Sequence, residues 1–574
     1  MDKISKKNQM IKKRIKALVN KFKKYKIDGY VIPKNDEFFS EYSEVDRLKT
    51  ISNFSGSAGY SVILKNKNYL FVDGRYTIQA QKESAPNFQI LNYQKIFNCE
   101  LFKNLTLGID PKMFTYEQIK KFFNKHNKVK FIESNLIDQI YKKKYKSNKS
   151  FFSLKNKLVG ENYKKKTSKI IKFLKKNKSE FLFITAPENV AWLLNIRGWD
   201  NPNSPMPNCY LLINNQNKIY LISKKNKASK LIREKKINSS QIIDPKDFKN
   251  LIMSLRGKKI IIDNKTCSVF YENILDKKFK ILKKEDPIYL LKAVKNKKEI
   301  KNMINTHILD GVALTKFIYW IKNKNKKKIT EFEAQNKLEY FRKKNKDYLY
   351  PSFNTIAGTA ENGAIVHYRA TKNNTKKINK KDIFLCDSGG QYKYGTTDVT
   401  RTICFTKPKK NIMNIFTRVL KGHIAVVNSN LNIHTNGKLI DLKARKFLKE
   451  INLDYEHGTG HGVGFFSNVH EGPQAISKFN KIKIREGMIL SNEPGYYKKG
   501  KFGIRIENLM YVKKYKTKLR FENLTLAPID KDLINFNLLS NNEKNYLLEY
   551  NLNIYSKLSR YLNLNEKKWL ASFI

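Results

Sequence analysis

Five potential metal ligands lie in the last third of the chain. Asp387 and Asp398 are eleven residues apart, and His461, Glu493 and Glu507 follow them. Carboxylate oxygens and an imidazole nitrogen suit Mn²⁺, Co²⁺, Fe²⁺ or Zn²⁺, with little selectivity among these ions. Two such ions about 3.5–4 Å apart share a hydroxide whose pKa falls into the working range of an enzyme. The five residues therefore predict a hydrolase with a two-metal centre.

The local sequence around these residues decides between a site and scattered charges. Any one of the five, taken alone, is more often a surface charge or a structural histidine. Glycine-rich turns and apolar flanks adjoin them, however, and burying carboxylates without a metal or a partner is costly. Gly458, Gly460 and Gly462 also allow the backbone to pass close to a ligand cluster. The combination favours a metal site.

Three further histidines, His367, His457 and His470, lie in the same part of the chain, which has eight histidines in all. An imidazole beside a metal-activated hydroxide can stabilise a tetrahedral intermediate or donate a proton to a leaving amine. We therefore expect these three to act on the substrate. The remaining histidines are predicted to be structural or exposed: His126, His307, His423 and His434.

The part of the chain before these residues contains two series of alternating strands and helices. Apolar strand-like runs begin at residues 29–33 and, in a second series, at residues 181–184. Alternating strands and helices are typical of α/β domains, so the chain is predicted to contain two of them with the same architecture. The Asp286-Pro287 step resists helix formation and marks the end of the second domain.

The third domain is predicted to begin with two amphipathic helices, 296–323 and 331–344. Short runs at 383–387 and 400–404 are expected to pair as an antiparallel hairpin that brings Asp387 and Asp398 together. A mixed tail with an amphipathic helix at 541–561 completes the chain. The expected divisions are residues 1–150, 151–290, 291–517 and 518–574.

The composition of the chain indicates which partners to expect and in which cellular compartment the protein is located. The chain carries 114 basic and 50 acidic residues, a formal charge of +64, but the lysines are spread along its whole length and no nucleic-acid-reading module accompanies them. No nucleic acid is therefore expected as a partner. The five cysteines, Cys99 among them, form no CxxC pair, and no secretory or membrane-spanning run is present. These features predict a cytoplasmic protein without a membrane partner.

Several segments resemble aminopeptidase P, the Xaa-Pro aminopeptidase branch of the pita-bread metallopeptidases. In the third domain they are Pro351-Ser352-Phe353, Asp387-Ser388-Gly389, Gly395-Thr396-Thr397-Asp398-Val399-Thr400-Arg401-Thr402, His457-Gly458-Thr459-Gly460-His461-Gly462-Val463-Gly464 and Asn492-Glu493-Pro494-Gly495-Tyr496-Tyr497. In the first two domains they are Asn53-Phe54-Ser55-Gly56-Ser57-Ala58-Gly59, Val72-Asp73-Gly74-Arg75-Tyr76 and Ala191-Trp192-Leu193-Leu194-Asn195-Ile196-Arg197-Gly198. The resemblance therefore spans nearly the whole chain.

The resemblance implies a fold and a set of metal ligands. It implies two creatinase-like N-terminal α/β domains followed by a pita-bread α+β catalytic domain and a C-terminal extension of the aminopeptidase P type. By the family's pattern, Asp387 holds one metal, His461 and Glu493 hold the other, and Asp398 and Glu507 bridge the two. The implied cofactors are two divalent metal ions, with Mn²⁺ as the expected metal.

The resemblance also implies a reaction. A bridging hydroxide attacks the carbonyl before proline in an Xaa-Pro peptide, with Glu493 as general base and proton carrier. His367, His457 and His470 are expected to contact the substrate and the intermediate. Proline-containing peptides are thus the expected partners, together with a second copy in a homodimer formed through the C-terminal domain.

The tail and the first domain leave two points open. Four aromatic residues of the tail could form the dimer surface or pack against their own domain: Tyr550, Tyr555, Tyr561 and Trp569. Relatives often carry a histidine where Phe38 or Phe39 stands, so the preference at distal substrate positions is expected to differ here.

Three alternative functions remain. Prolidase shares the ligand set but cuts dipeptides only, and the two N-terminal domains and the long tail favour the aminopeptidase. Methionine aminopeptidase would not need the first ~290 residues of such a chain. A metal-free binding module of the same fold is disfavoured because all five ligand positions are occupied by metal-binding residue types.

Overall fold

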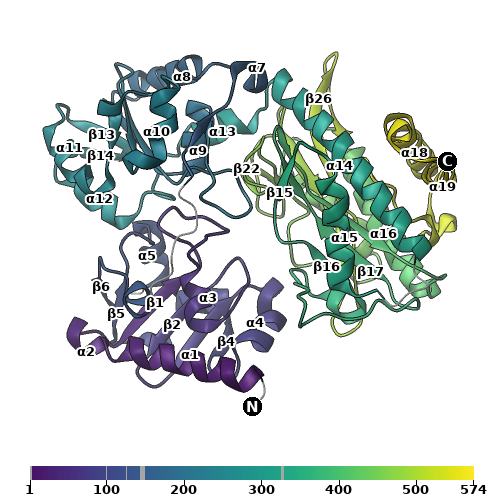
Figure 1. Cartoon of the computed structure of the whole chain (residues 1–574), viewed down its shortest axis with the longest axis horizontal. Coiled ribbons are helices and arrows are strands. Elements are labelled where there is room, and N and C mark those ends of the chain that lie inside the picture. The colour runs from purple at the N-terminus through teal and green to yellow at the C-terminus, as the bar shows by residue number, and fades with distance from the viewer. Residues whose placement is uncertain (1–2, 99, 124–125, 142–148, 325–328) are drawn as a thin grey trace. The chain divides into compact units, whose positions relative to one another are not determined.

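The computed structural model describes residues 3–98, 100–123, 126–141, 149–324 and 329–574, and it divides the chain into two compact units. The first unit contains residues 1–156 and 161–288. The second unit contains residues 157–160 and 289–574. Figure 1 labels the elements of both units.

The first half of unit 1 is a six-stranded mixed sheet in the order β4-β3-β2-β1-β5-β6. β2 is antiparallel to β1 and β3, whereas the β3–β4, β1–β5 and β5–β6 pairs are parallel. The strands are β1 (Gly29–Pro33), β2 (Tyr60–Leu64), β3 (Asn68–Val72), β4 (Gln89–Asn92), β5 (Thr106–Ile109) and β6 (Lys128–Phe131). The helices are α1 (Lys3–Val19), α2 (Phe22–Tyr25), α3 (Arg47–Ser52), α4 (Thr77–Ser84), α5 (Tyr116–Phe122) and α6 (Leu136–Ile140).

Alternation along the strands explains why this sheet is covered on both faces. In β1, Tyr30 and Ile32 pack in one apolar cluster with α1, α3 and α6, whereas Val31 packs in a second cluster on the opposite face. Successive side chains of a strand point to opposite faces, so a strand that is apolar throughout requires cover on both sides. The apolar runs at these positions thus form strands that have apolar cover on both faces of the sheet.

The second half of unit 1 repeats the first in topology. Its sheet has the order β12-β11-β10-β8-β13-β14, with antiparallel pairs at β8–β10 and β10–β11 and parallel pairs elsewhere. The strands are β8 (Phe181–Ile184), β10 (Tyr210–Asn214), β11 (Ile219–Ile222), β12 (Ile242–Ile243), β13 (Lys259–Ile262) and β14 (Lys280–Lys283); β7 (Phe152–Ser153) pairs separately with β9 (Ile196–Arg197). The helices are α8 (Tyr163–Lys176), α9 (Pro187–Leu194), α10 (Lys225–Arg233), α11 (Phe248–Ser254) and α12 (Val269–Asp276). Both sheets share one strand order and one set of directions, so the predicted duplication is confirmed.

Unit 2 contains the two predicted helices, α14 (Lys297–Lys324) and α15 (Glu331–Lys343), which lie side by side (Figure 1). The short helices α7 (Asn156–Val159) and α13 (Ile288–Ala293) also belong mostly to this unit. A reciprocal capping box between Thr330 and Glu333 starts α15. The apolar face of α14 packs against the strands that contain Phe384 and Val399. The two long helices therefore form a layer over the sheet that carries the first aspartate.

Four short sheets follow the two helices. Their orders are β15-β18-β19, β16-β17-β20, β22-β21-β23-β26-β27 and β24-β25. The strands are β15 (Tyr348–Pro351), β16 (Ile356–Thr359), β17 (Phe384–Ser388), β18 (Gly390–Tyr392), β19 (Gly395–Thr396), β20 (Val399–Ile403), β21 (Gly460–Gly462), β22 (Glu471–Ile476), β23 (Ile489–Asn492), β24 (Gly495–Lys498), β25 (Phe502–Arg505), β26 (Asn508–Tyr515) and β27 (Lys518–Asn523). The helices α16 (Lys410–Val427) and α17 (Gly437–Lys449) separate β20 from β21.

The predicted antiparallel pairing of the aspartate strands is confirmed, but the simple hairpin is not. β17 pairs antiparallel with β20, and Asp387 lies opposite Thr400. The chain between them does not form a plain turn, because it makes β18 and β19, which belong to a different sheet with β15. Gly389 permits this sharp departure: a Cβ there would lie 2.0 Å from the carbonyl oxygen of Thr397.

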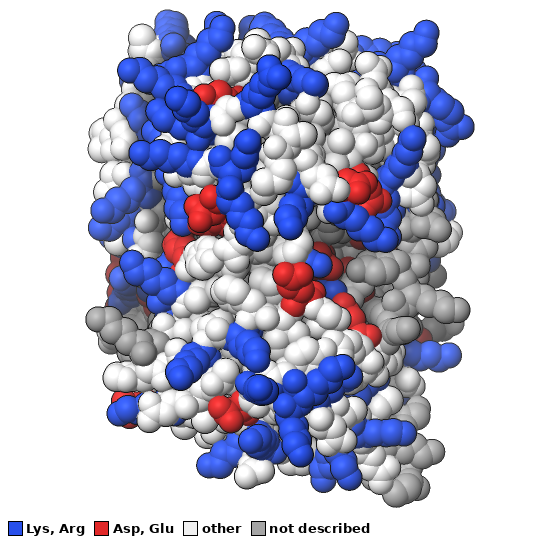
Figure 2. Space-filling model, turned by 90° about the vertical axis from the view of Figure 1, so that its left-hand side faces the viewer, with Lys and Arg blue, Asp and Glu red and all other residues white. Residues whose placement is uncertain are grey.

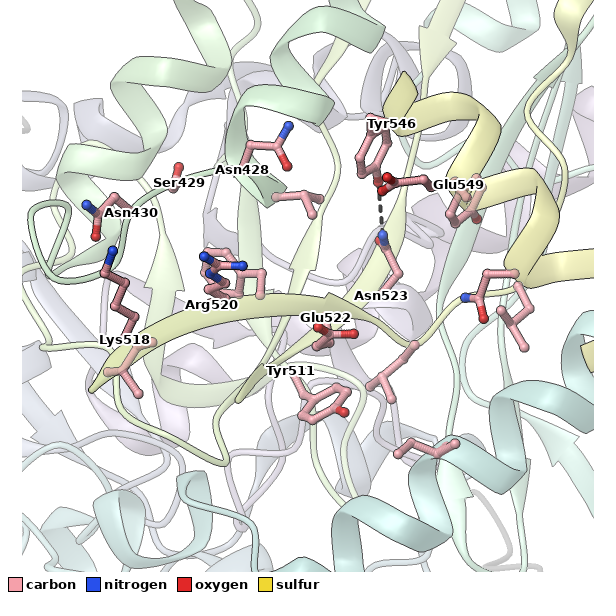
Figure 3. Close-up of a pocket in the computed structure, with 18 of the residues that line it drawn as sticks. Asn428, Ser429, Asn430, Tyr511, Lys518, Arg520, Glu522, Asn523, Tyr546 and Glu549 are labelled. Atoms are coloured by element: carbon pink, nitrogen blue, oxygen red, sulfur yellow. Dashed lines mark hydrogen bonds between the residues drawn. The ribbon is translucent and has the colours of Figure 1, made fainter. Parts of the chain in front are cut away.

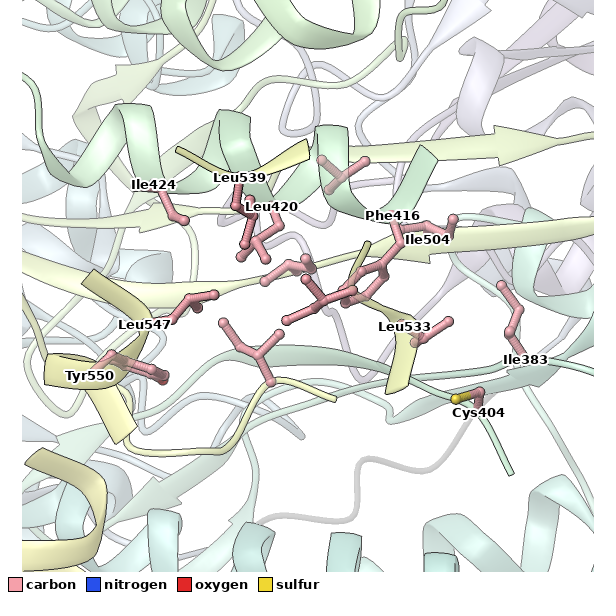
Figure 4. Packing of buried hydrophobic residues seen from close by; sticks show 14 of the residues in the cluster. Ile383, Cys404, Phe416, Leu420, Ile424, Ile504, Leu533, Leu539, Leu547 and Tyr550 are labelled. Atoms are coloured by element: carbon pink, nitrogen blue, oxygen red, sulfur yellow. The ribbon is translucent and has the colours of Figure 1, made fainter. Parts of the chain in front are cut away.

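The C-terminal segment is an integral part of unit 2. α18 (Asn541–Leu558) and α19 (Leu564–Ala571) follow a turn-rich stretch, so the predicted helix ends three residues early, before a 3₁₀ turn at 559–561. Leu533, Leu547 and Tyr550 pack with Phe416 of α16 and Ile504 of β25 in one buried cluster (Figure 4). Of the four aromatic residues left open, Tyr550 is buried, Tyr555 and Trp569 pack against apolar clusters of the same unit, and Tyr561 is exposed.

The surface charge is dispersed. Figure 2 shows one face of the molecule, over which lysine and arginine side chains are scattered with acidic groups among them. Cys209, Cys267, Cys386 and Cys404 are buried free thiols, whereas Cys99 lies outside the described residues. Among the helices that the structure describes, none is long and apolar enough to cross a membrane.

Candidate metal centre

The five predicted ligands come from separate strands and loops of unit 2 and converge on one place. Asp387 is in β17 and Asp398 directly precedes β20; His461 is in β21, Glu493 directly follows β23, and Glu507 lies between β25 and β26. The ligand atoms fall into overlapping groups whose members lie within 4.8 Å of one another. The groups are Asp387 with Asp398 and Glu507, His461 with Glu493 and Glu507, and Asp398 with His461 and His470.

Backbone contacts between two sheets create this convergence. The N–H of Glu507 donates to the carbonyl of Thr400 (3.1 Å), which joins the loop after β25 to β20. The N–H of Glu493 donates to the carbonyl of Thr459 (2.8 Å), so the turn after β23 lies beside the turn before β21. Gly460 allows this close approach, because a Cβ there would lie 2.0 Å from the carbonyl oxygen of Ser491.

The carboxylates of the site repel one another. Burial, reinforced by neighbouring carboxylates, raises the pKa of Asp387 to about 7 even though Arg505 opposes the shift. Burial and the charges of Asp398 and Glu493 raise the pKa of Glu507 well above its ordinary value. Burial also raises the pKa of Glu493. Four acidic groups thus share a buried site with too little positive charge to balance them.

His461 lies in the same negative field, which favours its protonated, cationic form. Its Nε2 lies 3.5 Å from Oδ2 of Asp398 and 3.6 Å from Oε1 of Glu493. Burial lowers the pKa of His461, but these two carboxylates outweigh it and raise the pKa to about 9. Its Nδ1 lies 2.9 Å from the carbonyl oxygen of Gly462, a contact that orients the ring with Nε2 toward the carboxylates.

The arrangement fits a pair of divalent cations. Oδ1 of Asp387 is buried and has no hydrogen-bond partner among the described residues. Oxygen and imidazole donors, closely spaced and with an excess of negative charge, are the donor set that such ions require. Like charges at this spacing are costly without a cation between them. Asp387, Asp398, His461, Glu493 and Glu507 are therefore able to hold two ions.

The three additional histidines differ in their placement. The ring of His470 packs edge-on against His461, with centroids 4.4 Å apart, and His470 is exposed. Nε2 of His457 lies 2.8 Å from the hydroxyl of Tyr497. His367 lies in the turn after the 3₁₀ helix Ala360–Ala364, half-buried, and belongs to none of the three ligand groups. That helix packs against β25: a Cβ on Gly503 would lie 1.8 Å from the carbonyl oxygen of Gly363.

Full-length comparisons now identify the family. The chain is 36% identical to Xaa-Pro aminopeptidase 1 of Dictyostelium discoideum, over 96% of this chain and 93% of that protein. It is 35% identical to a probable Xaa-Pro aminopeptidase P of Laccaria bicolor, over 97% of this chain and 92% of that protein. The chain belongs to the aminopeptidase P family of metallopeptidases.

Family models divide this aminopeptidase P family member into four stretches. Residues 14–140 and 141–299 each match a creatinase/prolidase N-terminal domain, residues 301–514 match metallopeptidase family M24, and residues 517–572 match the C-terminal region of that peptidase. The expected fold, two creatinase-like domains followed by a pita-bread domain, is confirmed.

Solved structures support the same assignment. The X-prolyl aminopeptidase of Caenorhabditis elegans, described as a cytosolic enzyme with a di-nuclear active site, superposes with a TM-score of 0.90 at 28% identity, over 98% of this chain and 99% of that one. The prolidase of Pyrococcus horikoshii superposes with a TM-score of 0.51 at 26% identity, over 64% of this chain and 99% of that one. The full-length match is thus to an aminopeptidase, whereas the prolidase matches only part of the chain.

Two buried residues that bind candidate ligands of this aminopeptidase P family member were not among the predicted site residues. Arg505 donates to Oδ2 of Asp387 (2.6 Å) and to the hydroxyl of Tyr497 (2.6 Å). The hydroxyl of Thr400 donates to Oε2 of Glu507 (2.7 Å). A signal was available: Arg505 precedes Glu507 by two residues on nearly extended chain, which places the two side chains on one face.

A cavity of about 610 Å³ lies elsewhere in the same unit. It is bounded by the end of α16, the β26–β27 hairpin and α18, and Figure 3 shows its wall, where Asn523 donates to the hydroxyl of Tyr546 (2.9 Å). None of the eight predicted site residues lines it. The cavity is therefore distinct from the metal centre.

Proposed function

We propose that the chain is an Xaa-Pro aminopeptidase, which removes the first residue from peptides that have proline in second position. The observation that supports this most is the full-length similarity to Xaa-Pro aminopeptidases combined with an intact cluster of five ligands. Proline makes a dedicated enzyme necessary, because its amide lacks an N–H and its ring fixes φ.

The proposed ligand assignment follows the geometry and the family's pattern. Asp387 would hold one divalent ion, His461 and Glu493 the other, and Asp398 and Glu507 would bridge them; Mn²⁺ is the proposed metal. When bound, the two ions would supply, at neutral pH, the hydroxide nucleophile for attack on the carbonyl before proline. Arg505 orients Asp387, and Thr400 orients Glu507, through the hydrogen bonds described above.

The remaining roles concern proton transfer and substrate binding. Glu493 lies next to His461, has a partly exposed side chain and would carry a proton toward the leaving amine of proline. Of the three histidines, His470 is best placed to contact a substrate that enters from solution, because its ring is exposed and lies beside His461. His457 and His367 would contact the substrate farther from the ligands.

The same similarities support four further proposals. We place the domains at residues 1–150, 151–290, 291–517 and 518–574, close to the stretches matched by family models. A cytoplasmic location is supported by the C. elegans structure, which is described as cytosolic.

A homodimer through the C-terminal domain has support from exposed Leu548 and Leu552, four residues apart on α18. Proline-containing peptides are the proposed partners.

Cleavage of Arg-Pro-Pro and Gly-Pro by the Mn²⁺-loaded protein tests the proposal, with a chelator-treated sample as the control. Metal-dependent release of arginine from the tripeptide is the expected result. Cleavage of the dipeptide alone would assign a prolidase instead. A protein that binds metal and cleaves neither peptide acts on another substrate, and a protein that binds no metal contradicts the ligand assignment.

A further inference from the structure

Two lysines of unit 2 are buried where lysines are rarely found. Lys292 of α13 and Lys295, just before α14, have side chains only 2% and 1% exposed. Both ammonium groups bind one carboxylate, that of Glu471: Lys292 Nζ lies 3.2 Å from Oε2, and Lys295 Nζ contacts Oε1. The side chain of Glu471 is itself 3% exposed. Buried lysine is uncommon unless it is paired, and here two lysines share one partner.

Lys292, Lys295 and Glu471 form a buried triad of charges, and stability alone does not account for such an arrangement. Replacing a buried ion pair by apolar residues is often neutral or stabilising, so stability alone does not explain why three charges occupy this position. Burial raises the pKa of Glu471, but the two lysines outweigh burial and keep the pKa below its ordinary value. The carboxylate is therefore ionised, and both of its oxygens are held from fixed directions.

The residue next to Glu471 is His470. Glu471 begins β22 and lies opposite Gly462, the neighbour of His461, at an irregularity in the β21–β22 pairing. Because Glu471 directly follows His470, restraining the side chain of Glu471 also restrains the backbone next to His470. A Cβ on Gly464 would lie 3.1 Å from Oε2 of Glu471, so the loop after His461 packs directly against the same carboxylate.

The loop between His461 and Glu471 is held at a second point as well. The carbonyl of Ser467 accepts hydrogen bonds from Nε2 of Gln391 (2.8 Å) and from the hydroxyl of Thr396 (3.3 Å). His470 thus lies between two anchors, one from the β18–β19 segment and one from the two lysines. It is exposed while its neighbour Glu471 is buried, so the anchors restrain the chain while the imidazole stays accessible beside His461.

The lysines are themselves on a rigid support. The N–H of Lys295 donates to the carbonyl of Gly487 (2.9 Å), and Val294 forms a β-bridge with Met488, directly before β23. Oδ1 of Asn296 accepts hydrogen bonds from the N–H groups of Lys298 and Glu299 and so caps α14. The segment that carries the lysines is therefore tied both to β22, next to His470, and to β23, which leads to Glu493.

We propose that Lys292, Lys295 and Glu471 form a buried clamp that positions His470 beside His461 for the aminopeptidase reaction. The three are positioning residues, because none of them belongs to the ligand groups and they act through the backbone of His470. The inference rests on the proposed function for the role of His470. The placement of His470 by the clamp can be measured without any turnover.

The decisive variant removes the charges without leaving one unpaired: Lys292→Met, Lys295→Met and Glu471→Leu together. We expect it to fold with a melting temperature equal to or above that of the wild type and to bind the same amount of metal. Its kcat should fall about tenfold, at the lower end of what loss of supporting contacts costs a metal site, while KM changes less than about twofold. His470→Ala provides the reference for complete loss of the imidazole.

Three controls isolate the clamp from general effects. Lys421→Met with Glu543→Gln removes another ion pair of the same unit (2.6 Å) and should leave kcat unchanged. Lys295→Arg keeps the charge and should retain most of the wild-type kcat. If the triple variant does not fold, Lys292→Met alone leaves a balanced Lys295–Glu471 pair and should still lower kcat about threefold.

Imidazole NMR separates failure of the clamp from failure of the proposed function. With ¹³C-labelled histidine, diamagnetic Zn²⁺ in place of Mn²⁺ and His470→Gln for assignment, the wild type should give one sharp His470 signal and the triple variant a broadened or split one. If the wild type cleaves no Xaa-Pro peptide, the proposed function fails, yet this signal still tests the clamp. A triple variant with unchanged kcat, or with an unchanged His470 signal, overturns the inference.

Discussion

Two acidic clusters, one in each unit, differ in how their charges are balanced. In unit 1, the buried guanidinium of Arg47 binds Asp138 (2.9 and 2.7 Å) and Glu37 (3.2 and 3.2 Å). Burial raises the pKa of Glu37, but Arg47 outweighs burial and keeps that pKa below its ordinary value. In unit 2, Arg505 binds Asp387 and fails to offset burial, so the pKa of Asp387 is raised to about 7.

Hydrogen bonding sharpens the contrast. Asp36 and Asp110 of unit 1 also have pKa values raised to about 6 by burial, but each accepts hydrogen bonds from backbone N–H groups. Oδ1 of Asp387 has no such partner in the described part of the chain. A structural acidic cluster thus contains its own counter-charges and donors, whereas the cluster of unit 2 requires cations from outside. This difference distinguishes a metal centre from a salt-bridge network on physical grounds.

Removing one of the two carboxylates proposed to bridge the metals should have the largest effect. Asp398→Ala and Glu507→Ala are each expected to lose metal and to lower kcat/KM by more than the roughly 100-fold that outer partners of a metal site contribute. Both variants should remain folded, because each removes one of several repelling charges. The metal-free variants should even be more stable than the metal-free wild type.

Metal analysis, turnover and thermal unfolding of the same samples check this prediction. Asp138→Asn, in the acidic cluster of unit 1, serves as the matched control and should leave the metal content unchanged. Full turnover by either alanine variant would remove Asp398 or Glu507 from the ligand set.

Metal removal should make the stability of unit 2 fall with rising pH further into the alkaline range than that of unit 1. Burial raises the pKa of Asp387 from 3.8 to about 7, so between about pH 4 and 7 the metal-free folded state binds a proton that the unfolded state has released. The free energy of unfolding must then fall as the pH rises, by about 1.4 kcal/mol per pH unit for one group. His461, whose pKa the neighbouring carboxylates raise to about 9, continues the decline in the same direction.

In unit 1 the lowered pKa of Glu37 has the opposite sign, but it acts only below the ordinary value of 4.5, where its contribution to stability is lost as the pH falls. The raised pKa values of Asp36 and Asp110, about 6, give the acidic cluster of unit 1 a decline that ends near pH 6. Hydrogen exchange measured from about pH 5 to 8 on the chelated protein can follow each unit separately. Strands β17 and β21 should lose protection toward the alkaline end, and metal should abolish that loss by displacing the protons. Protection of these strands that is independent of pH without metal would contradict the charge imbalance at the site.

The sequence was informative wherever local pattern and global fold agree. Apolar strand-like runs that alternate with helices predicted the two α/β halves of unit 1, and the duplication followed from their order. The convergence of the five candidate ligands could be predicted because carboxylates on apolar, glycine-flanked segments are costly to bury unless a cation binds them. Even the pairing of β17 with β20 followed from two short β-like runs.

What could not be predicted depends on contacts between distant segments. The detour through β18 and β19 is set by pairing with β15, about 40 residues upstream of β18, and no local pattern announces it. Lys292 and Lys295 look like surface lysines in a chain with 114 basic residues, and only their approach to Glu471 shows that they are buried. Arg505 is similar, since its place in the chain does not say which carboxylate it binds.

The smallest expected effect comes from breaking the balanced cluster of unit 1. Arg47 of α3 holds Asp138 of α6 and Glu37 of the loop after β1, so Arg47→Met leaves two carboxylates without their partner. Both carboxylates are partly exposed, and water replaces some of the lost interaction, so the free energy of unfolding should fall by about 2 kcal/mol. Arg47→Lys keeps the charge but not the paired geometry, so its free energy of unfolding should lie between those of Arg47→Met and the wild type.

Denaturant unfolding measures these differences, and the metal content of unit 2 should not change. If Arg47→Met were as stable as the wild type, the acidic groups of unit 1 would not depend on their internal counter-charge, and the contrast with the metal centre would fail.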